Sequence, residues 1–404
     1  MRILLCCVPF GCDNIGDEAI LITQVAILRA IDPALQITVA TRNPQQTCPE
    51  LDVETCPLLG HDVRGPAEIK QHIAKQDVVI WAGATGLSDY PEVALRVMAC
   101  AQALGKRCVV FGTGMNSRLN PALYTVTPGE KRLLLRALTR VSLGRWNAVQ
   151  SYERRLTARA HAQMAAVLPA CALIALRDEP SQRALTAAVP ELPSIVSADP
   201  AILLEPDRLP MSALPACIRA AIAAKAPRVG ICISAQGAVQ NRQGLIRLLN
   251  DLLAIPRLQL FGLAMNPITD RALMHELRKE LHTPEGFHLP EGLEDPTLMA
   301  KAAGSMQVVI SSRLHLLILA SISHVPLVGI SRGSKVDNYL ALYGERPAGS
   351  FEDLNPDHCL TRVRYFLADP SDFITRSREV RAQMLVRLDA ARAALGELLN
   401  DNSP

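Results

Sequence analysis

The sequence lacks an excess of charge of either sign, and it has few aromatic side chains. Its 404 residues carry 42 basic and 39 acidic side chains, a formal net charge of +3, and only 15 residues are aromatic. This balance gives no electrostatic reason to expect nucleic acid or an anionic membrane as the main partner. Hydrophobic residues make up 49% of the chain and charged residues 20%, a composition that excludes bulk disorder. Among the basic residues 34 are arginines and eight are lysines.

No cysteine pattern indicates a disulfide framework or a zinc site. The eleven cysteines include no C-x-x-C pair, and Cys6, Cys108 and Cys232 lie in apolar runs. We therefore expect reduced, buried thiols, which favours a cytoplasmic protein. Residues 1–8 form too short an apolar stretch for a signal peptide. The longest uncharged stretch, residues 314–331, contains two histidines and a proline, so we do not expect it to span a membrane.

Short apolar runs alternate with amphipathic runs along the whole chain. In the first half we predict strands over residues 3–8, 36–40, 77–81 and 108–111, and helices over 18–31 and 93–104. In the second half we predict strands over 228–234, 258–263, 307–311 and 327–330, and helices over 244–253, 270–281 and 314–321. Continuous apolar strands that alternate with helices indicate parallel sheets covered on both faces.

Seven prolines between residues 190 and 227 mark a linker between the two halves. We predict an N-terminal Rossmann-like domain over residues 1–203, a C-terminal one over 226–375, and a helix and tail over 376–404. The predicted fold class is α/β, with two doubly wound parallel-sheet domains facing a cleft. Ligands of such sheets bind outside the carboxyl ends of the strands.

The turn between the first strand and the first helix, Gly11-Cys-Asp-Asn-Ile-Gly-Asp-Glu18, is rich in glycine and polar groups. Its two glycines allow a sharp turn, and a helix N-terminus presents N–H groups to an anion. Asn14 and Asp17 add polar side chains at the end of the strand. Helix capping by Asp17 is the alternative explanation, but capping alone does not require so many polar residues. The pattern is neither G-x-G-x-x-G nor a Walker loop.

A second polar element, Ile310-Ser-Ser-Arg-Leu-His315, stands at a predicted strand-to-helix junction. Arg313 supplies a rigid fork of donors for carboxylate or phosphate, and His315 can move a proton near neutral pH. The alternative is that carbonyls and loop carboxylates satisfy both side chains locally. Their joint position at a strand end favours a functional role.

Two further segments are candidates for ligand contacts. The loop over residues 330–338 carries Arg332 and Lys335 after the neighbouring strand, which would bring them to the same edge as His315; a solvated loop explains them equally well. The segment 175–181 offers Arg177, although its Asp-Glu-Pro sequence also fits a helix start. Arg177, Arg313 and Arg332 are predicted to converge on the cleft.

These elements resemble, in the same order, the polysaccharide pyruvyltransferase family. The matching pieces are Asn14-Ile-Gly-Asp-Glu-Ala-Ile20, Arg177-Asp-Glu-Pro-Ser181, Ser312-Arg-Leu-His315 and Lys335. The resemblance covers most of the chain and implies a GT-B-like pair of Rossmann domains. It also implies transfer of the enolpyruvyl unit of phosphoenolpyruvate onto two sugar hydroxyls, which forms a pyruvate ketal. The implied acceptor is a saccharide of a bacterial cell envelope or exopolysaccharide, commonly lipid-linked or polymer-bound.

The chemistry of the implied reaction suggests roles for residues of this chain. Asp17, from the N-terminal domain, is expected to be the general base for the acceptor hydroxyl, and His315 the general acid. Lys335 is expected to neutralise charge that develops on the phosphate. The other substrate contacts are expected from Asn14, Gly16, Arg177, Ser312, Arg313 and Arg332. We expect no metal and no cofactor, because phosphoenolpyruvate is itself the donor substrate.

The sequence departs from the family pattern in two places. A turn that is usually Gly-Gly-Gly-rich reads Gly83-Ala-Thr-Gly86, and the segment 120–170 is longer and rich in arginine. Both differences could reshape the acceptor side. The arginines are dense enough for peripheral contact with a lipid-borne acceptor at the inner face of the membrane, but a solvated helical face explains them equally well. The acceptor sugar and the oligomeric state are left open.

Two alternative functions follow from the same fold. The first is a GT-B glycosyltransferase that uses a nucleotide sugar. Many such enzymes carry a Glu-x7-Glu pair, whereas Glu345 and Glu352 are one residue too close. The second is a non-catalytic protein that binds a saccharide or an anion. The joint presence of Asp17, His315 and Lys335 argues against this second alternative.

Overall fold

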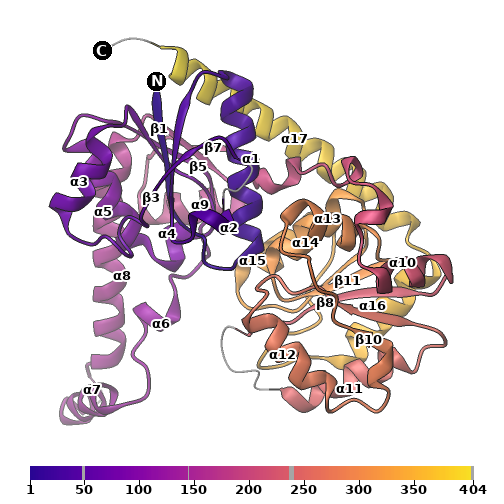
Figure 1. Ribbon diagram of the computed structural model, residues 1–404. Coiled ribbons are helices and arrows are strands. Elements are labelled where there is room, and N and C mark those ends of the chain that lie inside the picture. The colour runs from indigo at the N-terminus through magenta and orange to yellow at the C-terminus, as the bar shows by residue number, and fades with distance from the viewer. Residues whose placement is uncertain (48–50, 144, 236–240, 402–404) are drawn as a thin grey trace. The chain divides into compact units, whose positions relative to one another are not determined.

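The computed structural model describes residues 1–47, 51–143, 145–235 and 241–401. The chain divides into two compact units, each built around one sheet (Figure 1). Unit 1 comprises residues 1–9, 25–199 and 388–404, and unit 2 comprises residues 10–24 and 200–387.

Unit 1 contains a seven-stranded sheet in the order β3-β2-β1-β4-β5-β6-β7. Its strands are β1 (Arg2–Phe10), β2 (Gln36–Thr41), β3 (Glu54–Cys56), β4 (Val78–Trp81), β5 (Arg107–Thr113), β6 (Leu173–Leu176) and β7 (Ile195–Val196). The central strands pair in parallel, with Ile3 opposite Val78 and Val79 opposite Cys108. Every residue of β4 is buried, because helices cover both faces of a parallel sheet.

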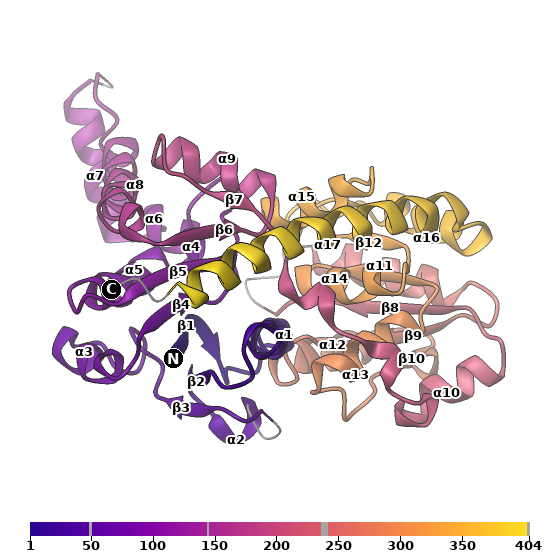
Figure 2. The same cartoon turned by 90° about the horizontal axis from the view of Figure 1, so that it is seen from above.

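The helices of the first half of the chain follow the alternation that the sequence predicts. They are α1 (Ile15–Ile31), α2 (Pro44–Thr47), α3 (Pro66–Ala74), α4 (Gly86–Asp89), α5 (Pro91–Gln102), α6 (Pro121–Tyr124), α7 (Glu130–Val141), α8 (Ala148–Val167) and α9 (Glu179–Ala188). The arginine-rich segment 120–170 forms α6, α7 and α8. Figures 1 and 2 both show α8 extending away from the sheet of unit 1, with α7 against its far end.

Unit 2 contains a five-stranded parallel sheet in the order β10-β9-β8-β11-β12. Its strands are β8 (Arg228–Cys232), β9 (Gln259–Gly262), β10 (Phe287–His288), β11 (Val308–Ser311) and β12 (Leu327–Gly329). Its helices are α10 (Ala216–Ala223), α11 (Arg242–Leu253), α12 (Thr269–Arg278), α13 (Pro296–Gly304), α14 (Leu314–Ile322), α15 (Ser334–Leu342) and α16 (Pro356–Ala368). The last helix, α17 (Ser371–Asn400), begins in unit 2, and its residues from 388 onward belong to unit 1. The strand order reverses between β8 and β11, which is where ligands of such sheets bind.

The predicted fold class of two parallel-sheet α/β domains with a C-terminal helix is confirmed. The last helix begins at Ser371 rather than at residue 376, because the side chain of Asp369 accepts the N–H of Ser371 at 2.9 Å and so starts the helix earlier. In the described part of the chain, the helices are too short or too polar to cross a bilayer. The ten cysteines that the structure describes are unbridged thiols.

Candidate active site

The turn after β1 is closed by Asn14, which caps helix α1. The carbonyl of Asn14 accepts the N–H groups of Asp17 and Glu18 at 2.9 and 3.1 Å, and its Oδ1 accepts that of Gly16 at 3.2 Å. The alternative explanation, in which Asp17 caps the helix, is therefore wrong. The helix begins at Ile15, so that Asp17 lies within its first turn. The amide of Asn14 instead donates to Oδ2 of Asp17 at 2.7 Å.

The carboxyl group of Asp17 is buried in unit 2 near several cations. Only 5% of Asp17 is exposed. Burial raises its pKa above the ordinary value, while the charge of His315, the hydrogen bond from Asn14 and the charges of Lys335 and Arg313 act in the opposite direction. The sequence analysis placed Asp17 on the N-terminal domain, whereas the structure groups residues 10–24 with unit 2. Asp17 and these cations therefore belong to one compact unit.

The imidazole ring of His315 packs directly on the backbone of Gly16. A β-carbon built on Gly16 would lie 2.2 Å from Nδ1 and 2.3 Å from Cγ of His315, closer than any real contact. Glycine is required at this position because the ring occupies the space of a side chain. The backbone of the turn after β1 thus fixes where the imidazole lies.

His315 stands one residue into α14, at the end of β11. Leu314 is 5% exposed and packs into the core, whereas Arg313 and His315 are half-buried. The junction is held by Ser311, whose hydroxyl accepts the N–H of Arg313 at 2.9 Å and donates to its carbonyl at 2.8 Å. These bonds give the two functional side chains a rigid support.

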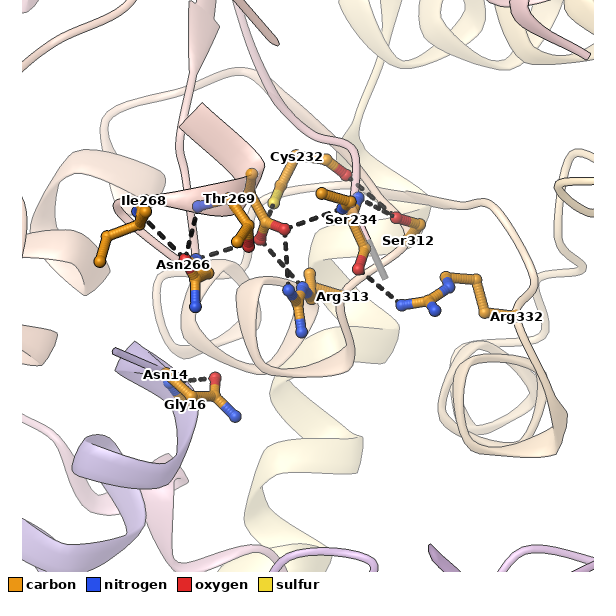
Figure 3. A network of polar contacts seen from close by, with 12 residues as sticks. Asn14, Gly16, Cys232, Ser234, Asn266, Ile268, Thr269, Ser312, Arg313 and Arg332 are labelled. Carbon is orange, nitrogen blue, oxygen red and sulfur yellow. Dashed lines mark hydrogen bonds and ion pairs between the residues drawn. The ribbon is translucent and has the colours of Figure 1, made fainter. Parts of the chain in front are cut away.

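The guanidinium of Arg313 is held by Asp270, a residue that the sequence analysis did not single out. Nε and Nη2 of Arg313 donate to the two carboxylate oxygens of Asp270 at 2.9 and 2.7 Å. Asp270 is fully buried and also accepts the N–H groups of Ala235 and Asn266. The alternative for Arg313, pairing with a carboxylate, is therefore met in part, because Asp270 lies in the first turn of α12 rather than in a loop. The pairing uses two of the five N–H donors, and Figure 3 shows another guanidinium nitrogen pointing away from these bonds.

A second set of bonds joins the ends of β8 and β11 to the loop after β12 (Figure 3). The N–H of Ser234 donates to the hydroxyl of Ser312 at 2.9 Å, and the N–H of Ser312 donates to the carbonyl of Cys232 at 3.0 Å. Nη1 of Arg332 donates to the hydroxyl of Ser234 at 2.6 Å, and its guanidinium lies 5.2 Å from the ring centre of Phe351. Ser312 and Arg332 thus share one polar network at the carboxyl edge of the sheet.

Lys335 lies in the first turn of α15, after β12. It is half-buried, and its charge lowers the pKa of Asp17. Gly333 at the N-cap has a φ of 141°, a conformation that favours glycine. The charges of Lys335, after β12, and of His315, after β11, therefore act on the same carboxylate, that of Asp17.

Glu18 follows Asp17 in the first turn of α1 and is a second titratable group of this turn. Its Oε1 accepts the N–H of Gly11 at 2.8 Å. Burial and the negative charges of Asp17 and Asp13 raise the pKa of Glu18 to about 7, against the effect of the bond from Gly11. No sequence pattern could have indicated this shift, because it depends on how completely packing removes water.

Arg177 lies in unit 1, whereas the other eight predicted site residues lie in unit 2. It is buried at the end of β6, with Nε donating to Asp178 at 3.0 Å and Nη1 lying 4.0 Å from Asp199. Its guanidinium packs on Gly114, where a β-carbon would lie 2.5 Å from Nη2. Asp178 also accepts the N–H of Ser181 at 2.8 Å, which confirms the predicted helix start at α9.

The altered glycine-rich turn of unit 1 retains a glycine-like conformation. Ala84 has a φ of 59°, in the left-handed region that residues with a β-carbon rarely adopt. Its carbonyl accepts the N–H of Gly114 at 2.6 Å, which ties this turn to the turn after β5. Alanine therefore stands in a backbone position that suits glycine.

Several solved structures are similar to this chain over almost its whole length. The UDP-GlcNAc 2-epimerase of Neisseria meningitidis, bound to UDP-GlcNAc, superposes with a TM-score of 0.61 at 14% identity and covers 100% of both chains. HepE of Anabaena, in complex with UDP and glucose, gives 0.58 at 14% identity over 99% of both chains. The spinosyn rhamnosyltransferase SpnG, complexed with thymidine diphosphate, gives 0.52 at 14% identity over 99% of this chain and 100% of its own. At these identities the likeness shows the GT-B-like fold alone.

Sequence comparison identifies the family. A search of curated proteins found no relative that matches the chain. The profile of the family described as polysaccharide pyruvyl transferase matches residues 14–334. This range begins at the cap of α1, includes Asp17, Arg177, Arg313 and His315, and ends one residue before Lys335. The chain therefore belongs to the polysaccharide pyruvyl transferase family, a family of transferases.

Proposed function

We propose that the protein transfers the enolpyruvyl group of phosphoenolpyruvate to two hydroxyls of a saccharide, forming a cyclic pyruvate ketal and inorganic phosphate. The observation that carries the proposal is the buried Asp17 carboxyl beside His315 and Lys335. In the balanced reaction the two hydroxyls lose two protons. One proton becomes part of the new methyl group at C3 of the donor, and the other leaves with the phosphate.

Asp17 is the proposed general base for the acceptor hydroxyl. Burial raises the pKa of its carboxyl, which makes the carboxylate a stronger base than an exposed aspartate. The bond from the amide of Asn14 fixes the position of one carboxylate oxygen. A base held in this way can accept a proton without reorganising.

His315 is the proposed general acid, acting at C3 of the enol or at the departing phosphate. Protonation at C3 leaves a positive charge at C2, which the neighbouring carboxylate of the donor stabilises. The first hydroxyl oxygen then bonds to C2, the bond from C2 to the phosphate oxygen breaks, and the second hydroxyl oxygen bonds to C2 to close the ketal. Contact with Gly16 keeps the imidazole within reach of these atoms in the proposed complex.

The donor carries a carboxylate and a phosphate, so binding requires several fixed cations. We assign charge neutralisation at the phosphate to Lys335 and anion contacts to Arg313 and Arg332. Arg313 would contribute the N–H groups that Asp270 does not engage. Asn14, Gly16 and Ser312 are proposed to complete the contacts from unit 2, and Arg177 is a proposed substrate contact of unit 1. The scheme needs no metal and no cofactor.

The acceptor is proposed to be a saccharide of a bacterial envelope polysaccharide or exopolysaccharide. Phosphoenolpyruvate is a metabolite of the cytoplasm, so the reaction is placed there, with a lipid-linked acceptor presented at the inner face of the membrane. Membership of the family supports a polysaccharide as the substrate. The particular sugar and its linkage are matters for an acceptor screen.

A glycosyltransferase that uses a nucleotide sugar is the competing function on this fold. The carboxylate of Glu345, one of its two candidate acids, accepts from Nη2 of Arg362 at 2.6 Å and is thus engaged in a structural ion pair. Thermal-shift measurements with phosphoenolpyruvate and a panel of nucleotide sugars separate the two functions, because a bound ligand stabilises the folded state. Stabilisation by phosphoenolpyruvate is expected. Stabilisation by a nucleotide sugar alone would favour the glycosyltransferase.

A non-catalytic binding protein would also be stabilised by its ligand, so a second measurement is needed. Release of inorganic phosphate from phosphoenolpyruvate is followed while saccharide acceptors are added. Acceptor-dependent release that is lost in Asp17→Asn supports pyruvyl transfer. Binding of phosphoenolpyruvate and saccharide without release of phosphate would favour the binding protein.

A further inference from the structure

Helix α7 exposes its apolar side to solvent, the reverse of an ordinary surface helix. The half-buried residues of this segment include Leu135, Thr139 and Ser142. Thr139 accepts the N–H of Ala148 at 3.0 Å, and Ser142 accepts that of Trp146 at 3.2 Å. Polar bonds therefore hold α7 against the start of α8, and we call the two helices the α7–α8 hairpin. No residue of α7 is buried.

The opposite side of the hairpin forms what we call the α7 face. Its large apolar side chains are between 43% and 84% exposed: Leu133, Leu134, Leu138, Val141, Leu143 and Trp146. Leu134, Leu138 and Val141 recur at spacings of three and four residues, so they form one stripe along the helix. An apolar stripe of this size on a soluble chain marks an interaction site.

Cations surround the α7 face. Lys131, Arg136, Arg140 and Arg145 are exposed, and Glu130 is the one acidic residue in the sequence from 130 to 146. Figures 1 and 2 show α7 at the far end of α8, away from the sheet of unit 1. An apolar stripe with a basic rim on a projecting element is the pattern of a helix that lies in a membrane interface.

We propose that the α7 face docks the protein on an anionic phospholipid surface. Leu134, Leu138 and Val141 would enter the boundary between headgroups and acyl chains, with Trp146 at headgroup level. The basic rim would contact lipid phosphates. The α7 face belongs to unit 1 and Asp17 to unit 2, and none of the residues of the α7 face has a role in the proposed reaction.

A second copy of the chain is the other apolar partner to consider. In a two-fold contact through the α7 face, the same patch meets itself. Arg136 and Arg140 of one copy would then approach the same cations of the other, with few acids on the segment to compensate. Charge complementarity therefore favours an anionic lipid surface over self-association.

The test is co-sedimentation of the full chain with vesicles of phosphatidylcholine, alone or mixed with phosphatidylglycerol. We expect binding to the mixed vesicles that weakens as salt is added. One double variant carries Leu134→Glu and Val141→Glu, and its binding to vesicles should fall at least about tenfold. A second double variant carries Arg136→Gln and Arg140→Gln, and its preference for anionic lipid should fall by about tenfold or more. Val386→Glu is the matched control, because Val386 is 71% exposed on α17, and it should bind as the parent chain does.

Two results would overturn the proposal. The first is vesicle binding that does not differ where it should. The parent chain would sediment equally with vesicles that contain or lack phosphatidylglycerol, or the glutamate variant would sediment with vesicles as much as the parent chain does. The second is a dimer, seen by sedimentation velocity without lipid, that the glutamate variant dissociates. That outcome would assign the α7 face to self-association.

Discussion

The imidazole of His315 lies against the backbone of Gly16, where a β-carbon would be 2.2 Å from Nδ1. This contact joins two sequence elements that are almost 300 residues apart, the turn after β1 and the junction between β11 and α14. It places the proposed acid next to the residue that precedes the proposed base, Asp17. The packing on this one glycine thus helps to fix the position of the proposed acid relative to the proposed base.

Replacing Gly16 with alanine is expected to displace the ring of His315 and to lower kcat for phosphate release at least about 100-fold. The chain should still fold, because α1 accommodates alanine well. Gly65→Ala is the control, since a β-carbon at Gly65 meets its nearest atom at 3.5 Å. Unchanged turnover in Gly16→Ala would show that the position of the ring does not matter for the reaction.

His315→Gln is expected to give a folded protein that binds phosphoenolpyruvate and turns over at least about 100-fold more slowly. Glutamine retains hydrogen-bonding groups but cannot transfer a proton near neutral pH. Steady-state phosphate release measures turnover, and calorimetry measures donor binding. A near-parental kcat would remove His315 from the mechanism.

Asp17 sets the pH dependence that we expect of kcat/KM. A general base must be deprotonated, so the rate should fall as the pH falls through the raised pKa of Asp17. This acidic limb should lie above the range of an exposed aspartate. Asp17→Asn should lower kcat/KM at least about 100-fold, and its pH profile should no longer show the acidic limb. Asp207→Asn, at an exposed position, should change neither, and persistence of the limb in Asp17→Asn would assign it to another group.

Glu18 is expected to make stability depend on pH. Its folded-state pKa of about 7 lies above the value of 4.5 for an ordinary glutamate, so the folded state binds this proton more tightly. The resulting stabilisation is present below about pH 4.5 and is lost as the pH rises to about 7, at roughly 1.4 kcal/mol per pH unit. Urea denaturation between these pH values measures how the free energy of unfolding depends on pH. In Glu18→Gln this dependence should lose the contribution of about one bound proton. An unchanged slope would mean that Glu18 titrates normally.

Asp270→Asn is expected to destabilise unit 2 by about 3–5 kcal/mol, because it leaves the guanidinium of Arg313 without its buried partner. Donor binding should weaken as well, since Arg313 would lose its fixed orientation. Asp251→Asn breaks an exposed pair with Arg247 and should cost less than about 1 kcal/mol. Equal effects of the two substitutions in urea denaturation would contradict a structural role for the buried pair.

Much of the fold could be predicted from the sequence, because buried parallel strands read as continuous apolar runs. The strand at Val78–Trp81 and the junction before His315 are clear in the sequence for this reason. The pairing of Arg313 with Asp270 could not be predicted, because the two residues are far apart in the chain and an acid at the start of a helix reads as a cap. The grouping of Asp17 with unit 2 depends on tertiary contacts such as the bond from Ile15 N to the carbonyl of Met265 at 3.0 Å.

The α7 face shows a different limit. Leucines at helical spacing predict a buried stripe, yet Leu134 and Leu138 are exposed because Thr139 and Ser142 form the bonds to the neighbouring segment. The spacing shows that the helix has an apolar side. Only the packing shows which side faces its neighbour.

The central claim is that the group around Asp17 binds phosphoenolpyruvate as donor. Isothermal titration calorimetry of phosphoenolpyruvate and of UDP-GlcNAc, with the parent chain and with Lys335→Ala, tests it most directly. The account predicts that phosphoenolpyruvate binds, that Lys335→Ala weakens this binding at least about tenfold, and that UDP-GlcNAc gives no binding heat. Binding of UDP-GlcNAc without binding of phosphoenolpyruvate would contradict it.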